Sequence, residues 1–89
     1  MKYHLIISEK AVKQLKKLDK ITSEIIISWI EKNLDGSESP RSKGKALTGS
    51  LTGTWRYRVG DYRVLAEIND GELIILVVEI RNRKNVYDR

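Results

Sequence analysis

Residues 54–80 read TWRYRVGDYRVLAEINDGELIILVVEI, and this stretch decides the fold. Apolar and polar residues alternate over residues 55–68, which is the period of a β-strand with one buried face. Gly60–Asp61 interrupts the alternation as a two-residue turn of type II′, and Asp70–Gly71 is typical of a type I′ turn. The apolar run Leu73–Ile80 then predicts a central strand that is covered on both faces. The stretch therefore predicts a three-stranded antiparallel meander.

The residues before this stretch predict one strand and two helices. Tyr3–Ile7 is a short apolar run typical of a strand, and Ser8 directly after it is a helix N-cap residue. Apolar residues at helical spacing predict a helix that ends near Asp19 and a second helix over residues 21–34, joined as an antiparallel hairpin. We expect the hairpin to pack on one face of the meander and the first strand to add beside it. The predicted fold class is α+β, with the order β-α-α-β-β-β.

Residues 36–53 predict a loop, because eleven of these 18 residues are Gly, Ser, Thr or Pro. We expect a short turn around Lys45–Leu47 within it. A loop of this length inside a small domain is often functional. Since no second core follows the loop and a chain of 89 residues buries only one core, residues 1–89 are predicted to form a single domain.

Charge and composition narrow the classes of function. The formal net charge is +5, and all seven arginines follow residue 40. The planar guanidinium group of arginine binds phosphate through two parallel hydrogen bonds, so the second half of the chain is suited to a phosphate-bearing partner. The absence of cysteine excludes disulfides and thiolate metal sites. The longest aliphatic run, Leu73–Val78, is too short to span a membrane, and residues 1–20 lack the apolar stretch of a signal peptide, so a cytoplasmic location is predicted.

The turn at Gly60–Asp61 places three arginines on one face of the predicted sheet. With these two residues in the turn, Arg58 lies opposite Arg63, and the alternation puts Arg56 on the same face. Like charges that face each other destabilise a sheet, so we expect an anion between them, and phosphate is the candidate. The alternative is that these arginines only keep an exposed face of the sheet in contact with water, or that they form ion pairs with Glu67. One carboxylate cannot neutralise three guanidinium groups, which favours the phosphate site.

Five motifs along the chain point to a known family. They are SEKA at 8–11, LKKL at 15–18, GKALTG at 44–49, WRYRVGDYRV at 55–64 and RKNVY at 83–87. In this order they resemble the RelE/ParE toxin superfamily of type II toxin–antitoxin systems, and its RelE-like mRNA interferase branch in particular. The resemblance implies a RelE-like toxin domain that cleaves mRNA in the ribosomal A site. The implied reaction needs no metal or other cofactor, because the 2′-hydroxyl of the messenger attacks the adjacent phosphate.

The resemblance also implies the residues of the site. The catalytic residues would be Arg56, Arg58, Arg63, Arg83 and Tyr87, and the RNA-binding residues would be Lys43, Lys45, Arg81 and Lys84. Arg63 and Arg83 would bind the scissile phosphate, whereas Tyr87 would stack on a base or orient the 2′-hydroxyl. Arg56 and Arg58 would bind flanking phosphates or balance charge on the leaving 5′-oxygen. Where many relatives read Gly-His-Arg, residues 81–83 read Arg-Asn-Arg, so proton transfer would fall to Tyr87, to the ribosome or to no group, with a modest rate.

The partners implied by the resemblance are an acidic RelB-like antitoxin that wraps the toxin, the 70S ribosome with its mRNA, and operator DNA reached only through the antitoxin. Two other functions remain open on the same fold, because fold does not decide function. One is that of a ParE-like, non-enzymatic inhibitor of DNA gyrase. The other is that of a catalytically weak toxin that acts mainly with its antitoxin in autoregulation. The facing arginines favour the endoribonuclease, and the missing histidine favours the alternatives.

Overall fold

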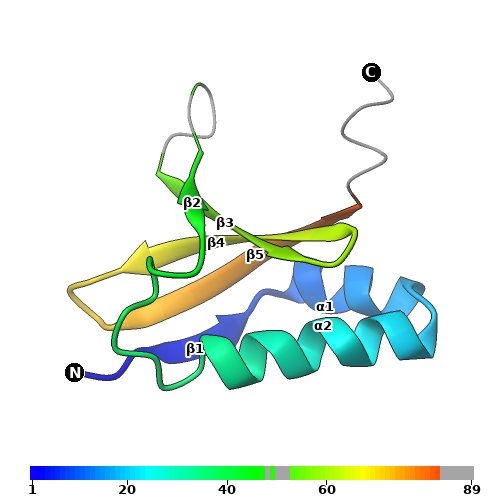
Figure 1. Cartoon of the computed structure of the whole chain (residues 1–89), viewed down its shortest axis with the longest axis horizontal. Coiled ribbons are helices and arrows are strands. Elements are labelled where there is room, and N and C mark those ends of the chain that lie inside the picture. Colours follow the sequence, from blue (N-terminus) through cyan, green and yellow to red (C-terminus); the bar gives the residue numbers. More distant parts are fainter. Residues whose placement is uncertain (48, 50–52, 83–89) are drawn as a thin grey trace.

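The computed structural model describes residues 1–47, 49 and 53–82. Its elements in chain order are β1 (His4–Ile7), α1 (Glu9–Lys17), α2 (Lys20–Asn33), β2 (Lys45–Ala46), β3 (Thr54–Val59), β4 (Tyr62–Asn69) and β5 (Ile74–Asn82). The strands form one sheet in the order β1-β5-β4-β3-β2, in which β1 is parallel to β5 and all other neighbours are antiparallel. Both helices lie against the same face of this sheet (Figure 1). The predicted α+β fold is therefore confirmed, with the first strand beside the meander as expected.

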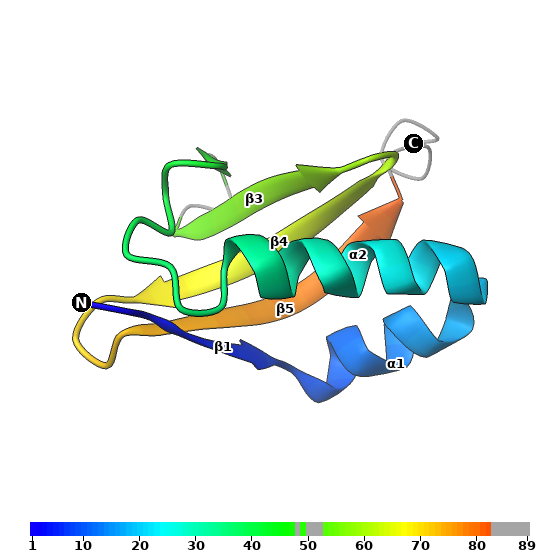
Figure 2. The ribbon, with the colours of Figure 1, turned by 60° about the horizontal axis from the view of Figure 1, so that its bottom comes forward.

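Both helices begin at the polar residues that precede their apolar stripes. The Ser8 side chain accepts a hydrogen bond from the backbone N–H of Ala11, and the Asp19 carboxylate accepts one from Thr22. These side chains satisfy N–H groups that have no partner within the first turn of a helix. The two helices form the predicted hairpin, which lies along the sheet in Figure 2.

The hydrophobic core lies between the helices and the sheet. From α2, Ile26 and Ile30 are buried at a spacing of four residues, and Leu34 continues the same stripe just after the helix. From α1, Ala11 and Leu15 are buried. The sheet contributes the buried side chains of Tyr57, Val59, Val64, Ala66, Ile75, Val77 and Ile80. The remaining face of the sheet, away from the helices, carries the charged residues considered below.

The first predicted turn is confirmed and the second is wrong. Gly60 has φ 60°, as the first position of a type II′ turn requires, and the strands beside it pair in the predicted register. A type I′ turn at residues 70–71 would need positive φ at both residues, but here the positive φ belongs to Leu73, at 56°. The reason is that the Asn69 side chain accepts a hydrogen bond from the backbone N–H of Glu72 at 2.9 Å, which forms a longer connection.

A β-bulge interrupts the pairing of β5 with β4. Leu65 lies opposite Glu79, but the next residue of β4, Ala66, lies opposite Val77, so β5 has one extra residue at Val78. Because strand side chains alternate between faces, the extra residue reverses which side chains point to the helices. Val77 and Ile80 are both buried in the core as a result. Residues 79 and 81 are thereby placed on the opposite face.

The predicted coverage of β5 on both faces and the predicted turn in the loop need correction. β5 is central, as expected, but among the described residues both helices lie on one face, and Ile74 and Leu76 on the other face are only partly buried. At Lys45–Ala46 the chain forms β2 in place of the expected turn, because it pairs with β3 at the edge of the sheet.

Within the part of the chain that the structure describes, no helix has the length and apolar character needed to cross a membrane.

Candidate nucleic-acid interface

Three arginines form a row across three neighbouring strands. Arg58 of β3 lies opposite Arg63 of β4, and Arg63 lies opposite Arg81 of β5. We call these three residues the arginine row, and the face of the sheet that carries them the arginine face. Neighbouring strands lie about 4.8 Å apart, so the row extends over roughly 10 Å. The predicted facing pair is confirmed, and the bulge in β5 extends it by a third guanidinium group.

A second row of the same face continues the positive charge towards β2. Lys45 lies opposite Arg56, and Arg56 lies opposite Leu65. A groove of about 370 Å³ lies at this edge of the sheet. Its lining residues are Ser42, Lys43, Gly44, Lys45, Arg56 and Arg58. Four of the six residues that line the groove are basic and none is acidic, so the groove is suited to a polyanion.

Of the two predicted RNA-binding lysines within the described residues, Lys43 makes a specific side-chain contact. Its Nζ donates a hydrogen bond to Asn33 Oδ1 at 2.6 Å, and the Asn33 amide in turn donates to the carbonyl of Trp29 at 2.8 Å. The contact ties the loop to the end of α2. Lys43 thus lines the groove while its ammonium group is held by the helix, whereas the Lys45 side chain is exposed on the edge strand.

Hydrogen bonds at the opposite end of the sheet hold the start of the loop. Arg41 donates two hydrogen bonds, each 3.0 Å long, to the carboxylate of Asp70, and the Tyr3 hydroxyl donates a third to the same group at 2.6 Å. The bonds from Arg41 and then from Tyr3 lower the pKa of Asp70. The guanidinium group of Arg41 also lies 5.8 Å from the ring centroid of Trp55. Sequence analysis did not identify Arg41, because its partners are distant in the chain.

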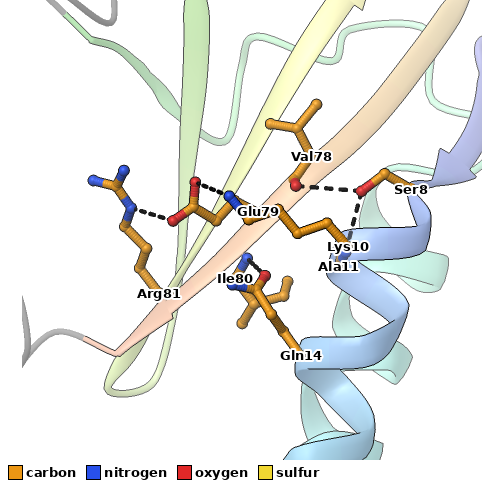
Figure 3. A network of polar contacts seen from close by, with 8 residues as sticks. All are labelled: Ser8, Lys10, Ala11, Gln14, Val78, Glu79, Ile80 and Arg81. Atoms are coloured by element: carbon orange, nitrogen blue, oxygen red, sulfur yellow. Dashed lines mark hydrogen bonds and ion pairs between the residues drawn. The ribbon is translucent and has the colours of Figure 1, made fainter.

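The acid nearest to the arginine row is Glu79, which sequence analysis also missed. Its Oε2 accepts a hydrogen bond from Nε of Arg81 at 2.7 Å, and its Oε1 lies 3.4 Å from Nζ of Lys10 on α1 (Figure 3). Partial burial acts to raise the pKa of Glu79, but the hydrogen bonds from Arg81 and Lys10 outweigh it and lower the pKa. One signal was available in the sequence, since Glu79 is the single acid within Leu73–Ile80.

The alternative partner, Glu67, lies in a different row. Glu67 is opposite Thr54 on one side and Leu76 on the other. Within residues 1–47, 49 and 53–82, no ion pair joins Glu67 to Arg56 or Arg58. Pairing with Glu67 therefore does not account for these two arginines. The predicted site residues Arg83, Lys84 and Tyr87 lie outside the described residues.

The arrangement can bind a chain of phosphates and stabilise added negative charge on one of them. Guanidinium groups donate hydrogen bonds but do not accept protons at ordinary pH, so the arginine row supplies electrostatic stabilisation and no general base. Any proton transfer during a reaction here needs a group other than Arg58, Arg63 or Arg81.

Comparison with known proteins gives consistent results. Residues 5–87 match the model of the family described as ParE toxin of type II toxin–antitoxin system, parDE. The chain is 32% identical to Toxin RelG of Mycobacterium tuberculosis over 73 residues, which cover 81% of this chain and 84% of RelG. It is 29% identical to Toxin RelE of the same organism, over 96% of this chain and 86% of that toxin. The crystal structure of the toxin–antitoxin complex RelBE2 from M. tuberculosis contains a chain with a TM-score of 0.83 and 25% identity, with 93% of each chain covered.

Proposed function

The chain belongs to the RelE/ParE superfamily of toxins from type II toxin–antitoxin systems, and on this basis we propose that it is a ribosome-dependent endoribonuclease that cleaves mRNA in the A site. The observation that carries the proposal is the arginine row together with the basic groove beside it. RelE toxins act as ribonucleases, and a row of guanidinium groups suits the backbone of RNA.

In the proposed reaction the 2′-hydroxyl oxygen of the messenger attacks the adjacent phosphorus. A bond forms between these two atoms, and the bond from phosphorus to the 5′-oxygen breaks. A 2′,3′-cyclic phosphate remains on one fragment, and the 5′-oxygen takes a proton from water and leaves as the 5′-hydroxyl of the other. Arg63 and Arg83 bind the scissile phosphate, and Arg56 and Arg58 stabilise charge on flanking phosphates or on the leaving oxygen. Tyr87 or a ribosomal group takes the proton of the 2′-hydroxyl, because none of the arginines accepts one.

Lys43, Lys45, Arg81 and Lys84 bind the flanking RNA in this proposal. The 70S ribosome positions the messenger, which places the activity in the cytoplasm. No metal or cofactor takes part in the proposed reaction.

We further propose an acidic RelB-like antitoxin as the partner that restrains the toxin. The solved complex RelBE2 supports this, because it pairs a chain of the same fold with an antitoxin. The molecule also has apolar surface for a partner to cover. Ile21 and Ile25, on the outer side of α2, are 71% and 57% exposed. Operator DNA would be reached only through the antitoxin.

One specific observation favours a second candidate function, inhibition of DNA gyrase without catalysis. The family model that matches residues 5–87 describes a ParE toxin. In that case expression of the chain arrests DNA replication and leaves ribosome-bound messengers intact, whereas the endoribonuclease cuts messengers within codons. Primer extension on messenger from arrested cells separates these two outcomes.

The decisive experiment compares the wild type with Arg63→Ala on programmed ribosomes. We expect the substitution to lower the rate of mRNA cleavage by roughly a hundredfold or more, because it removes a preorganised cation from the developing charge on phosphate. Lys16→Ala is the matched control, since it removes the same charge from an exposed position on α1 and leaves the rate unchanged. Cleavage by Arg63→Ala at the wild-type rate would show that the site is misplaced.

A further inference from the structure

The contact between Glu79 and Arg81 engages Nε of the arginine and not its two terminal nitrogens. Arg81 Nε donates a hydrogen bond to Glu79, and among the described residues no hydrogen bond from the two terminal nitrogens of Arg81 is found. A guanidinium group is planar and carries its five N–H groups in fixed directions, so a bond at Nε restricts the plane of the whole group. The terminal nitrogens, which lie beyond the Nε contact in Figure 3, form the pair that binds phosphate through two hydrogen bonds.

The Glu79 carboxylate is fixed by contacts with more than one element of the fold. Its side chain is 21% exposed, and its second oxygen lies near the Lys10 ammonium group of α1. The backbone on either side of Glu79 is bonded to α1 and its cap. Ile80 N–H donates to Gln14 Oε1 at 2.7 Å, and the carbonyl of Val78 accepts a hydrogen bond from the Ser8 hydroxyl at 3.2 Å. The start of α1 therefore fixes the bulge that turns both Glu79 and Arg81 onto the arginine face.

The charges near the arginine row suggest why such an acid is present. Three guanidinium groups in neighbouring strands repel one another, and a flexible arginine at the end of the row would turn away from the others. Glu79 is negative and would also repel RNA, so it lowers general affinity for phosphate. The contact at Nε gives Glu79 a way to act on the geometry of the row, because it restricts the plane of the Arg81 guanidinium group.

We propose that Glu79 is a positioning residue for Arg81, which holds the guanidinium plane so that its terminal nitrogens bind a phosphate of the RNA in line with Arg58 and Arg63. This proposal rests on the proposed function, since it assigns a role within the same site. It predicts that binding and turnover respond in opposite directions when the charge of Glu79 is removed.

The first test measures both quantities in Glu79→Gln. We expect affinity for an uncleavable 2′-O-methyl RNA oligonucleotide to rise severalfold, because one negative charge is removed from the face. We expect kcat on programmed ribosomes to fall roughly tenfold or more, because a misplaced cation stabilises the transition state less well. In an Arg81→Ala background, Glu79→Gln should have no further effect on kcat.

Glu67→Gln is the matched control for charge alone. It removes the same charge from the same face of the sheet, and Glu67 makes no ion pair with Arg81. We expect a similar gain in affinity for the oligonucleotide and an unchanged kcat. If Glu79→Gln behaves like this control, Glu79 acts only as a counter-ion and the positioning role is overturned. If Glu79→Gln weakens both binding and kcat, its role is structural and the proposal is equally overturned.

A second test does not depend on cleavage. The Nε–H resonance of Arg81 is followed by NMR in the wild type and in Glu79→Gln, with and without the 2′-O-methyl oligonucleotide. We expect a rigid Arg81 Nε–H that shifts on addition of the oligonucleotide in the wild type, and a mobile one in the variant. If the resonances behave in this way but the protein does not cut messengers, the positioning role of Glu79 stands and the proposed endoribonuclease function is rejected. Equal mobility in both proteins would overturn the positioning role whatever the activity.

Discussion

At the scale of single residues, Tyr57 joins the loop to the core. Its side chain is fully buried, and its hydroxyl donates a hydrogen bond to the carbonyl of Pro40. Its ring packs against Trp29 of α2, with the ring centroids 5.9 Å apart. Burial raises the pKa of Tyr57 to about 12, because the ionised form loses its hydration. The loop segment that leads to the groove is therefore held by the Tyr57 hydroxyl, which must stay protonated to donate this hydrogen bond.

The raised pKa of Tyr57 predicts a loss of stability in alkali. An unfolded chain releases the proton near the ordinary pKa of 10, whereas the folded chain keeps it until about pH 12. The contribution is thus fully present below pH 10 and is lost as pH rises towards 12, by about 3 kcal/mol of unfolding free energy. Tyr57→Phe should lack this loss, although at pH 9 it should be about 1 kcal/mol less stable than the wild type for want of the hydrogen bond.

Urea denaturation of both proteins at pH 9 and pH 11 checks this prediction. The two proteins differ only at residue 57, so the difference between their losses isolates the contribution of the Tyr57 hydroxyl. Equal losses in the wild type and Tyr57→Phe between these pH values would contradict it.

At the scale of elements, Gly44 sets how closely the loop approaches β3. A Cβ atom on Gly44 would lie 2.5 Å from the carbonyl oxygen of Arg56 and 2.6 Å from Nε1 of Trp55. Contacts this short do not occur, so any side chain at this position forces the loop away from the strand. The approach matters for the site, because residues 42–45 form one wall of the basic groove.

Gly44→Ala should therefore destabilise the fold and weaken RNA binding together. We expect a loss of about 1–3 kcal/mol of unfolding free energy, as for other overpacked positions, and weaker binding of the 2′-O-methyl oligonucleotide. Gly71→Ala is the matched control, because the nearest atom to its Cβ would be 3.5 Å away and its φ is not positive. Full stability and full affinity in Gly44→Ala would show that the loop does not need this approach.

At the scale of the whole molecule, the two faces of the sheet have different roles. One face packs on the helices and forms the core, and the other carries the arginine row at one end. The other end of that face holds a groove of about 520 Å³ that is lined by Ile6, Ile74 and Leu76 together with acidic side chains such as Glu67. Within the described residues, Arg56, Arg58, Arg63 and Arg81 thus share part of one face.

This distribution predicts how RNA binding responds to salt. If each member of the arginine row neutralises one phosphate, the row alone should contribute about −2 to the slope of log affinity against log salt concentration for a single-stranded oligonucleotide, and the other basic residues of the site should make the slope steeper. Arg58→Ala should make the slope less negative by about 0.7, whereas Lys16→Ala on α1 should leave it unchanged. Fluorescence anisotropy between 50 and 300 mM salt measures these slopes. A slope near zero in the wild type would mean that the face does not bind phosphates.

Local patterns in the sequence predicted most of the elements and part of the site. The alternation around Gly60–Asp61 determined the strands, their register and the facing pair Arg58 and Arg63, since a two-residue turn leaves one way to pair the strands. Helical spacing and the cap residue Ser8 determined the helix hairpin in the same way. These features depend on interactions between residues that are close in the chain. The local sequence pattern is therefore enough to predict them.

Tertiary contacts decided the rest. Regular alternation along β5 would place residue 81 on the same face as the buried Val77, and only the bulge at Val78 moves Arg81 into the arginine row. A bulge leaves strand hydrogen-bonding groups without a neighbour, and here Ser8 and Gln14 supply the missing partners from α1. Because these partners lie 66 to 70 residues away in the chain, no local pattern shows where the bulge is stable. The sequence by itself thus determined one arginine pair, and the packing of α1 against β5 decided that it became a row.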